Sequence, residues 1–253
     1  AQHEIDFRYG EALETADKIM TYKLTVKTIA KRHGLYASFM PKPKYGVCGS
    51  GMHINMSLSD MEGNNIFANP DDPNGLSKEA YSFIAGIMEH VRSMTAITNP
   101  IVNSYKRLVP GFEAPTYIAW SATNRSPLVR VPASRGAGTR VELRCPDCAC
   151  NPYLAIAVCL AAGLDGIKRG LTPPDSVQKD IYEMTEQERV EAGIGNLPSN
   201  LYEAIQEMKK SEFVKKVLGE EVFNKYIRAK SEEWDEYTSQ VTDWEIDRYL
   251  DRI

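Results

Sequence analysis

The stretch GSGMHINMSL, residues 49–58, changes from glycine-rich to strictly alternating after its third residue. Its apolar and polar side chains fall on opposite sides of an extended chain: Met52, Ile54, Met56 and Leu58 against His53, Asn55 and Ser57. A period of two is typical of a half-buried β-strand. The sequence therefore predicts a strand here, and the open question is whether its polar side faces solvent or a ligand.

The composition is typical of a soluble globular protein. Of 253 residues, 43% are hydrophobic and 25% charged, with a net charge of −4, which argues against nucleic acid as the main partner because duplex binding needs a basic face. The longest apolar run, residues 153–164, is shorter than the roughly 20 residues that span a bilayer, so we expect no membrane partner. Five cysteines in a long chain without a secretory signal favour free thiols and a cytoplasmic location.

Strand and helix patterns alternate along the first two thirds of the chain. Besides the strand above, short strands are predicted at residues 3–9, 117–122, 128–131 and 140–144. Helices are predicted from about 12 to 33, from about 77 to 98, and from the Asn151-Pro152 cap to Gly170. Residues 99–116 have little periodicity and are predicted to be a loop, and charged amphipathic helices follow residue 171. The pattern indicates an α+β fold with a helical C-terminal region.

Three of the predicted strands place ionic or polar groups opposite an apolar face. These groups are Glu4, Asp6 and Arg8, then His53, Asn55 and Ser57, then Arg140, Glu142 and Arg144. A single polar face of this kind is most simply a face exposed to solvent. If the three strands belong to one antiparallel sheet with its apolar face covered, however, their polar faces could line a cavity together. Carboxylates beside a histidine suit Mg²⁺ or Mn²⁺, and converging arginines suit phosphate or carboxylate groups.

Three other motifs can be interpreted either as part of a functional site or as ordinary structural features. Residues 99–115, with Lys106, Arg107 and Glu113, are either a surface connection or a charged lid over a site. The cluster CPDCAC, residues 145–150, has no matching histidine pair, which favours buried or loop thiols over a zinc site. The turn SRGAGTR, residues 134–140, lacks the spacing and the lysine of a P-loop, although its backbone N–H groups could still face a nucleotide.

Five segments together resemble glutamine synthetase of the bacterial type I. They are QHEIDFRY (2–9), KPKYGVCGSGMHINMSL (42–58), NPIVNSYKRLVPGFEAP (99–115), NRSPLVRVPASRGAGTRVELR (124–144) and NPYLAIAVCLAAGLDGI (151–167). The resemblance runs from residue 2 into the C-terminal helices. It implies a catalytic domain of curved antiparallel strands flanked by helices, with its core in residues 1–170 and a helical part in residues 171–253.

The resemblance also implies a role for individual residues. Two metal ions, Mg²⁺ or Mn²⁺, would bind. Glu4 would be a ligand of one ion, and His53 and Glu142 would be ligands of the other. Glutamate would contact Gly49, Arg107 and Arg144, and the nucleotide side would include Asn55, Ser57 and Arg140. Arg125 and Arg130 would act at the transferring phosphate and at the nucleotide. Glu113 would be a glutamate-site and catalytic residue on a flap that closes over the ammonium site.

The implied reaction joins ammonia to the γ-carboxylate of L-glutamate at the expense of ATP, through γ-glutamyl phosphate, giving glutamine, ADP and phosphate. Two alternatives remain open: a relative that ligates glutamate to a polyamine or another amine, and a non-catalytic folded module. The set Arg107, Glu113 and Arg144 favours ammonia.

The start of the chain, AQHEIDFRYG without a methionine, indicates a fragment entered in mid-domain. On that interpretation the family's N-terminal β-grasp domain is absent, and so are further metal ligands. We therefore expect that these 253 residues alone are inactive. We also expect that they do not form the family's dodecamer of two stacked hexameric rings but an altered homo-oligomer.

Overall fold

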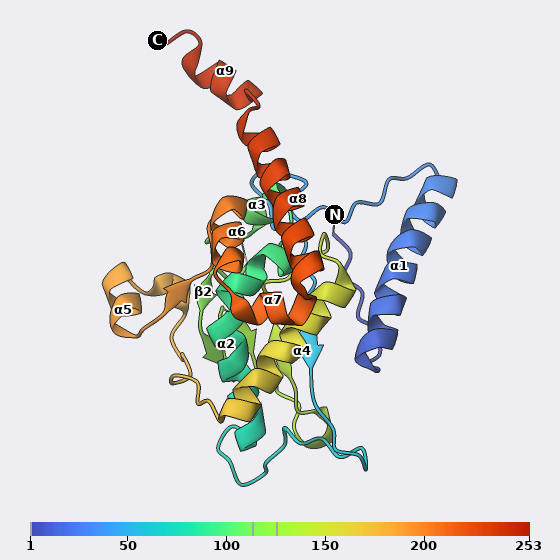
Figure 1. Ribbon diagram of the computed structural model, residues 1–253, viewed down its shortest axis with the longest axis vertical. Coiled ribbons are helices and arrows are strands. Elements are labelled where there is room, and N and C mark those ends of the chain that lie inside the picture. Colours follow the sequence, from blue (N-terminus) through green and yellow to red (C-terminus); the bar gives the residue numbers. More distant parts are fainter. Residues whose placement is uncertain (1, 113, 125) are drawn as a thin grey trace.

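The computed structural model describes residues 2–112, 114–124 and 126–253 and has an α+β architecture, mostly helical with small mixed sheets (Figure 1). The α-helices are α1 (Ala12–Arg32), α2 (Lys78–Thr98), α3 (Val102–Arg107), α4 (Pro152–Arg169), α5 (Glu186–Glu191), α6 (Leu201–Lys209), α7 (Glu212–Leu218), α8 (Glu220–Thr238) and α9 (Asp243–Tyr249). The strands are β1 (Ile54–Met56), β2 (Tyr117–Ile118), β3 (Trp120–Ser121), β4 (Val129–Arg130), β5 (Val141–Leu143) and β6 (Gly195–Asn196). Within the described residues, no helix combines the length and the apolar character needed to cross a membrane.

The three long predicted helices are confirmed, and their ends coincide with local capping signals. Ser77 accepts a hydrogen bond from the Ala80 N–H at the start of α2. Asn151 caps α4, and Gly170 ends it in the left-handed conformation at φ 62°. Such caps satisfy the backbone groups that a helix end leaves unpaired, so helix ends can be predicted from a few residues.

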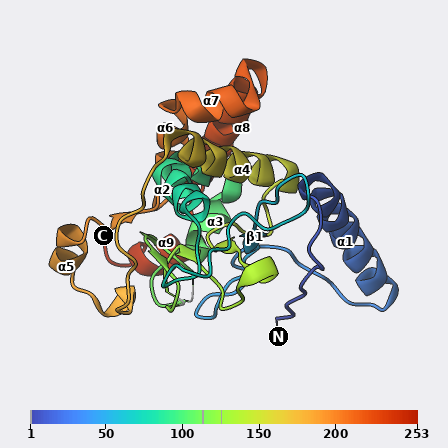
Figure 2. The same ribbon diagram turned by 90° about the horizontal axis from the view of Figure 1, so that it is seen from below.

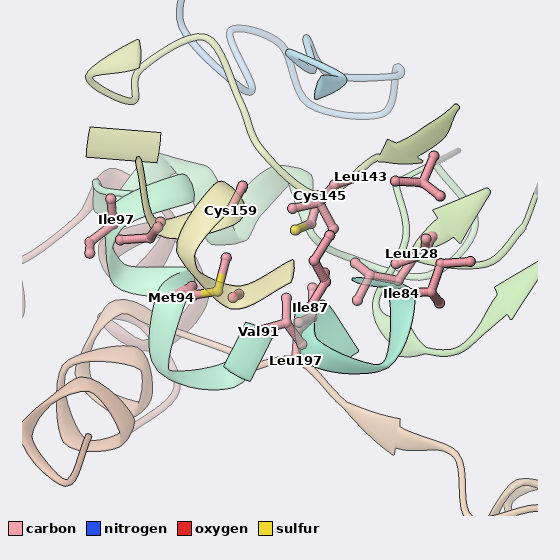
Figure 3. Packing of buried hydrophobic residues seen from close by; sticks show 14 of the residues in the cluster. Ile84, Ile87, Val91, Met94, Ile97, Leu128, Leu143, Cys145, Cys159 and Leu197 are labelled. Atoms are coloured by element: carbon pink, nitrogen blue, oxygen red, sulfur yellow. The ribbon is translucent and has the colours of Figure 1, made fainter. Parts of the chain in front are cut away.

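The core lies between the sheet and the pair α2 and α4. Figure 3 shows Ile84 and Ile87 of α2 close to Leu128 and Leu143 of the sheet region, and all four are fully buried. On the other side, α6 and α7 cover α2 and α4, so the long helices form the middle layer (Figure 2). The polar face of the sheet is therefore left free for a site.

Glycine allows α2 and α4 to approach closely. A Cβ atom on Gly166 would lie 2.0 Å from the Ser82 carbonyl oxygen, and one on Gly86 would lie 2.1 Å from the Ala162 carbonyl oxygen. These contacts are with backbone, which cannot turn away as a flexible side chain can. The helices would have to separate to accept any larger residue.

We therefore expect Gly166→Ala to lower the free energy of unfolding by about 1–3 kcal/mol, the usual cost of overpacking a core. Gly195→Ala is the matched control, because its Cβ would meet only Ile118 Cδ1, at an ordinary 3.8 Å. Urea unfolding followed by tryptophan fluorescence measures both variants. Equal stabilities of the two variants would show that the close helix contact is not what requires glycine.

A polar cluster joins the same two helices at their exposed side. His90 Nε2 lies 2.8 Å from Asp165 Oδ2, and Arg169 Nη1 lies 3.0 Å from the same oxygen. The hydrogen bond with His90 is the main cause that lowers the pKa of Asp165 below its ordinary value of 3.8. A carboxylate with a lowered folded-state pKa stabilises the fold above its unfolded-state pKa, and this contribution is lost as the pH falls through the folded-state pKa.

We expect Asp165→Asn to cost up to about 1 kcal/mol of unfolding free energy at pH 7, since the pair is partly exposed. The difference from the wild type should shrink as the pH falls below about 4. Urea unfolding at pH 7 and at pH 3 tests this, with the exposed loop variant Asp175→Asn as the control. A difference that is the same at both pH values would contradict the assigned role of the carboxylate charge.

The main sheet has the strand order β1-β5-β4-β3. β1 pairs antiparallel with β5, and β5 pairs antiparallel with β4, as predicted. β3 pairs with β4 in parallel, so the sheet is mixed and not wholly antiparallel. β2 forms a separate two-stranded sheet with β6.

Two local predictions are wrong. Residues 3–9 alternate like a strand but have no regular secondary structure, because they pair with no strand of the described chain. Residues 99–116 are not all loop, because α3 occupies Val102–Arg107. A helix of six residues is too short to show a clear hydrophobic period, which is why the pattern did not reveal it.

Candidate active site on the polar face of the sheet

The strand register places one row of polar residues across the sheet. Asn55 of β1 lies opposite Glu142 of β5, and Glu142 lies opposite Arg130 of β4. Side chains of directly opposite residues point to the same face. The two apolar neighbours of Glu142, Val141 and Leu143, point to the core and are fully buried. The register therefore brings together residues that lie almost 90 positions apart in the sequence.

Glu142 is the centre of this row. One carboxylate oxygen, Oε1, lies 3.3 Å from His53 Nδ1, and the other, Oε2, accepts a 2.8 Å hydrogen bond from Arg130 Nη1. Glu142 is only 6% exposed, and burial by itself raises its pKa. The hydrogen bond with His53 and the charge of Arg130 outweigh burial, so the net pKa lies below the ordinary value. Glu142 is consequently a carboxylate at neutral pH.

The residues assigned to the nucleotide side lie beside this centre. Arg140 Nε donates a 3.0 Å hydrogen bond to Asn55 Oδ1, and Arg140 Nη1 donates to the Gly138 carbonyl oxygen at 3.2 Å. Ser57 is exposed one residue beyond the end of β1. The guanidinium of Arg140 is thereby held between β1 and the turn that precedes β5, where it could meet an anionic group.

Arg107, near the end of α3, lies below this face and is only 3% exposed. Its Nη1 donates to the Cys145 carbonyl oxygen at 2.6 Å and to that of Pro146 at 3.3 Å, and its Nη2 donates to the Arg144 carbonyl oxygen at 3.1 Å. The guanidinium thus fixes the backbone that follows β5. Burial is the first cause that lowers the pKa of Arg107, but an arginine remains charged at any physiological pH.

Two glycines of the opening stretch pack against Arg107. A Cβ on Gly49 would lie 2.3 Å from the Pro41 carbonyl oxygen and 2.9 Å from Arg107 Cγ. A Cβ on Gly51 would lie 2.5 Å from Arg107 Nη2 and 3.2 Å from His53 Nε2. Gly51 therefore lies between the guanidinium and the imidazole. It was not among the predicted site residues, although its position two residues before His53 in the glycine-rich stretch was a signal for it.

The remaining predicted residues lie around this cluster. Arg144 donates from Nη1 to the Pro127 carbonyl oxygen at 3.4 Å. Glu4 is exposed on the irregular N-terminal segment, which Gln2 ties to the Gly49 carbonyl oxygen by a 2.9 Å hydrogen bond. Glu113 and Arg125 lie outside the described residues. The neighbours of position 113 are anchored: Lys42 Nζ lies 3.8 Å from the centre of the Phe112 ring, and Tyr182 Oη donates to the Ala114 carbonyl oxygen at 2.7 Å.

The donor set suits a divalent cation only in part. His53 and Glu142 offer one nitrogen and one ionised oxygen ligand from adjoining strands, and this pairing fits Mg²⁺ or Mn²⁺. In residues 2–112, 114–124 and 126–253, no three histidine, cysteine or acidic side chains gather into a metal cluster. Glu4 is accordingly not brought to the pair, and its ligand role stays a prediction.

The fold and this cluster together define a class of protein. A buried carboxylate lies between an imidazole and a guanidinium, on a sheet that carries further arginines, and converging arginines are typical of sites for anionic groups. The family model "Glutamine synthetase, catalytic domain" matches residues 1–249. The chain belongs to this family.

Individual relatives agree with the match. The chain is 61% identical over 251 residues to a protein called glutamine synthetase from Clostridium saccharobutylicum, covering 99% of this chain and 56% of that protein. It is 57% identical over 253 residues to the one from Methanosarcina mazei, covering 100% of this chain and again 56% of the relative. The chain therefore spans about half the length of the curated relatives it matches.

Solved structures give the same fold. The structure entitled "GmaS/ADP complex-Conformation 1" superimposes with a TM-score of 0.88 at 40% identity, covering 97% of this chain and 56% of that one. "Apo GmaS without ligand" superimposes with a TM-score of 0.85 at 40% identity, covering 96% and 55%. The predicted family and fold class are thus confirmed, and an ADP complex exists within the same fold.

Proposed function

We propose that the protein is a glutamate–ammonia ligase: it phosphorylates the γ-carboxylate of L-glutamate with ATP and displaces the phosphate with ammonia. The observation that carries this proposal is the cluster His53–Glu142–Arg130, in which an ionised, buried carboxylate sits between a metal-ligand type of side chain and a phosphate-binding type. Relatives that carry the name glutamine synthetase at 57–61% identity support the choice of substrates.

His53 and Glu142 would hold a Mg²⁺ or Mn²⁺ ion at the nucleotide phosphates. When bound, such an ion neutralises charge on the transferring phosphoryl group. Arg130 is already aligned on Glu142 and would contribute a second positive charge at the same place. Arg140, held by Asn55, would bind the nucleotide. We also propose the roles predicted for three further residues: Arg125 at the transferring phosphate and the nucleotide, Ser57 at the nucleotide, and Glu4 as a metal ligand.

The acyl phosphate must be protected from water, and we propose that the segment around position 113 does so. Lys42 against Phe112 and Tyr182 on the Ala114 carbonyl hold both neighbours of Glu113. We propose that Glu113 acts there at the ammonium site. Closing this segment would exclude water, which would otherwise hydrolyse γ-glutamyl phosphate. The part of the site that we propose binds glutamate consists of Gly49, Arg107 and Arg144.

The test is an assay of the purified protein at its full natural length. With glutamate, ATP, Mg²⁺ and ammonium we expect glutamine, ADP and phosphate in equal amounts. Replacing ammonium with putrescine or methylamine distinguishes the proposed enzyme from ligases that use another amine. We expect faster product formation with ammonium, and a preference for either amine would contradict the proposal. Absent turnover would point instead to a non-catalytic module, and turnover without ATP would contradict the proposed reaction.

Three further parts of the proposal rest on the family and on composition. The expectation that these 253 residues alone are inactive stays a prediction, tested by γ-glutamyl transfer with Mn²⁺. A homo-oligomer is proposed from the family, and light scattering of the purified protein measures its size. The five cysteines are all free thiols, which supports a cytoplasmic location.

A further inference from the structure

A carboxylate that has no assigned role lies next to the glutamate side of the site. Asp147 is fully buried, at 0% exposure, in the turn that follows β5. Asn99 Nδ2 donates to Asp147 Oδ2 at 3.0 Å, and the Ala149 N–H donates to Oδ1 at 2.9 Å. An isolated buried carboxylate is costly, so a fold that keeps one usually has a compensating charge nearby.

Arg107 supplies a positive charge close enough to lower the pKa of Asp147. Its guanidinium donates to the carbonyl oxygens of the three residues that precede Asp147. Besides Asp147, the acidic groups whose charge acts on Arg107 are the thiols Cys145 and Cys148. Burial raises the pKa of Cys145 to about 12 and also raises that of Cys148, so these thiols are neutral at physiological pH. Asp147 is therefore the carboxyl group whose charge acts most strongly on Arg107. Burial raises the pKa of Asp147 above its ordinary value, against the lowering effect of the Ser104 and Ala149 hydrogen bonds and of the Arg107 charge.

The hydrogen bonds around Asp147 connect it to the same backbone. Asn99 Nδ2 also donates to the Cys145 carbonyl oxygen at 2.8 Å, and this oxygen accepts from Arg107 as well. The Asp147 N–H donates to the Thr98 carbonyl oxygen at 3.1 Å. The end of α2, the turn after β5 and Arg107 thus form one buried network, and Asp147 is the carboxyl group within it.

This network reaches the polar face through Gly51. Gly51 forms an antiparallel bridge with Asp147, and the space for its missing side chain separates Arg107 Nη2 from His53 Nε2. A shift of the guanidinium would therefore move the backbone between the glutamate side and His53. Sub-ångström placement of such groups has large effects on binding and catalysis.

We propose that Asp147 is a positioning residue: it holds the Arg107 guanidinium against the carbonyls of residues 144–146 and so sets the affinity of the site for its acidic amino-acid substrate. This inference rests on the proposed function for the identity of that substrate. It concerns a residue that touches neither substrate nor metal and acts through Arg107.

The test is Asp147→Asn in the purified protein at its full natural length. Asparagine keeps the shape and the acceptor for the Ala149 N–H but removes the charge. We expect the KM for glutamate to rise roughly 10–100-fold, the usual range for a misplaced binding group, while the KM for ATP changes less than about twofold. Asp165→Asn makes the same chemical change on α4 and should leave both KM values unchanged.

Ser104→Ala is the milder variant, because it keeps the Asp147 carboxyl group and removes one of its hydrogen bonds, together with the 3.3 Å hydrogen bond from the Ile101 N–H. If Asp147→Asn does not fold, as judged by its thermal melting, a smaller rise in the KM for glutamate in Ser104→Ala would support the proposal. Unchanged KM values in both folded variants would overturn it. An equal rise in the KM for glutamate and for ATP would overturn it too, since that indicates general damage.

A crystal structure of Asp147→Asn separates this inference from the proposed function. If the wild-type protein does not use glutamate, the proposed function fails, but the position of Arg107 can still be compared. We expect the guanidinium to leave the Cys145 and Arg144 carbonyl oxygens in the variant. A guanidinium that stays in place would refute the positioning role whatever the substrate is.

Discussion

Replacing Glu142 with glutamine is expected to lower kcat for glutamine formation by roughly 10²–10³-fold, the effect of losing one preorganised charge at a phosphoryl-transfer site. The variant keeps the size of the side chain and an acceptor for Arg130 Nη1, so the sheet should remain intact. It removes the ionised oxygen that lies beside His53. Metal affinity should fall with kcat, because a neutral amide is a much weaker ligand for Mg²⁺ or Mn²⁺ than a carboxylate.

Steady-state kinetics and Mn²⁺ binding by calorimetry, both on the purified protein at its full natural length, check this result. Glu89→Gln is the matched control, since Glu89 pairs with Arg169 on the surface of α2, away from the sheet. A Glu142→Gln variant with wild-type kcat and Mn²⁺ affinity would show that the cluster His53–Glu142–Arg130 is a structural ion pair only.

The largest effect on stability is expected for Arg107→Ala. Removing the guanidinium takes a donor from the carbonyl oxygens of Arg144, Cys145 and Pro146, of which the last two keep a second donor. It also removes the positive charge that acts on the buried Asp147. Breaking a buried charge pair by removing one partner costs about 3–5 kcal/mol of unfolding free energy. Such a loss is a large fraction of the stability of a typical domain.

Urea unfolding of the purified protein measures this loss, with Arg92→Ala as the control. Arg92 pairs with Glu207 at 3.5 Å in a partly exposed position, where an ion pair contributes at most about 1 kcal/mol. The double variant Arg107→Ala/Asp147→Asn should recover part of the loss, because the unpaired anion is gone. A double variant no more stable than Arg107→Ala would mean that the two charges are not coupled.

The helices illustrate what could be predicted from local sequence. α1, α2 and α4 begin and end within one or two residues of the predicted positions. Ser77 satisfies the start of α2 locally, Asn151 and Gly170 satisfy the two ends of α4, and Gly34 follows α1 in the left-handed conformation. The strand predicted at residues 3–9 was wrong because its formation does not depend on local sequence alone. Its alternation is local, but a strand also requires a partner strand, which no local pattern specifies.

The candidate site shows the same division between what local sequence predicts and what it does not. Alternation in residues 49–58 correctly separated His53 and Asn55 from the apolar side of β1, and the family resemblance assigned them to a nucleotide site. The resemblance also assigned Glu142 to the same metal as His53, but the contact of Glu142 with Arg130 was not predicted, since it depends on the register of β4 and β5. Asp147 escaped attention because CPDCAC was judged by its sulfur atoms, whereas the chemically notable atom in that turn is a buried carboxylate oxygen.

The sequence by itself determined the family, the α+β class, the long helices and the polar face of β1, because these depend on contiguous residues and on motifs that are read in order. Only the tertiary structure decided which polar residues meet. Strand register joins Asn55, Glu142 and Arg130 in one row, and the fold buries Arg107 and Asp147 near enough for each to act on the charge of the other. The physical reason is that register and burial arise from contacts between segments far apart in the chain, whose energies no single segment contains.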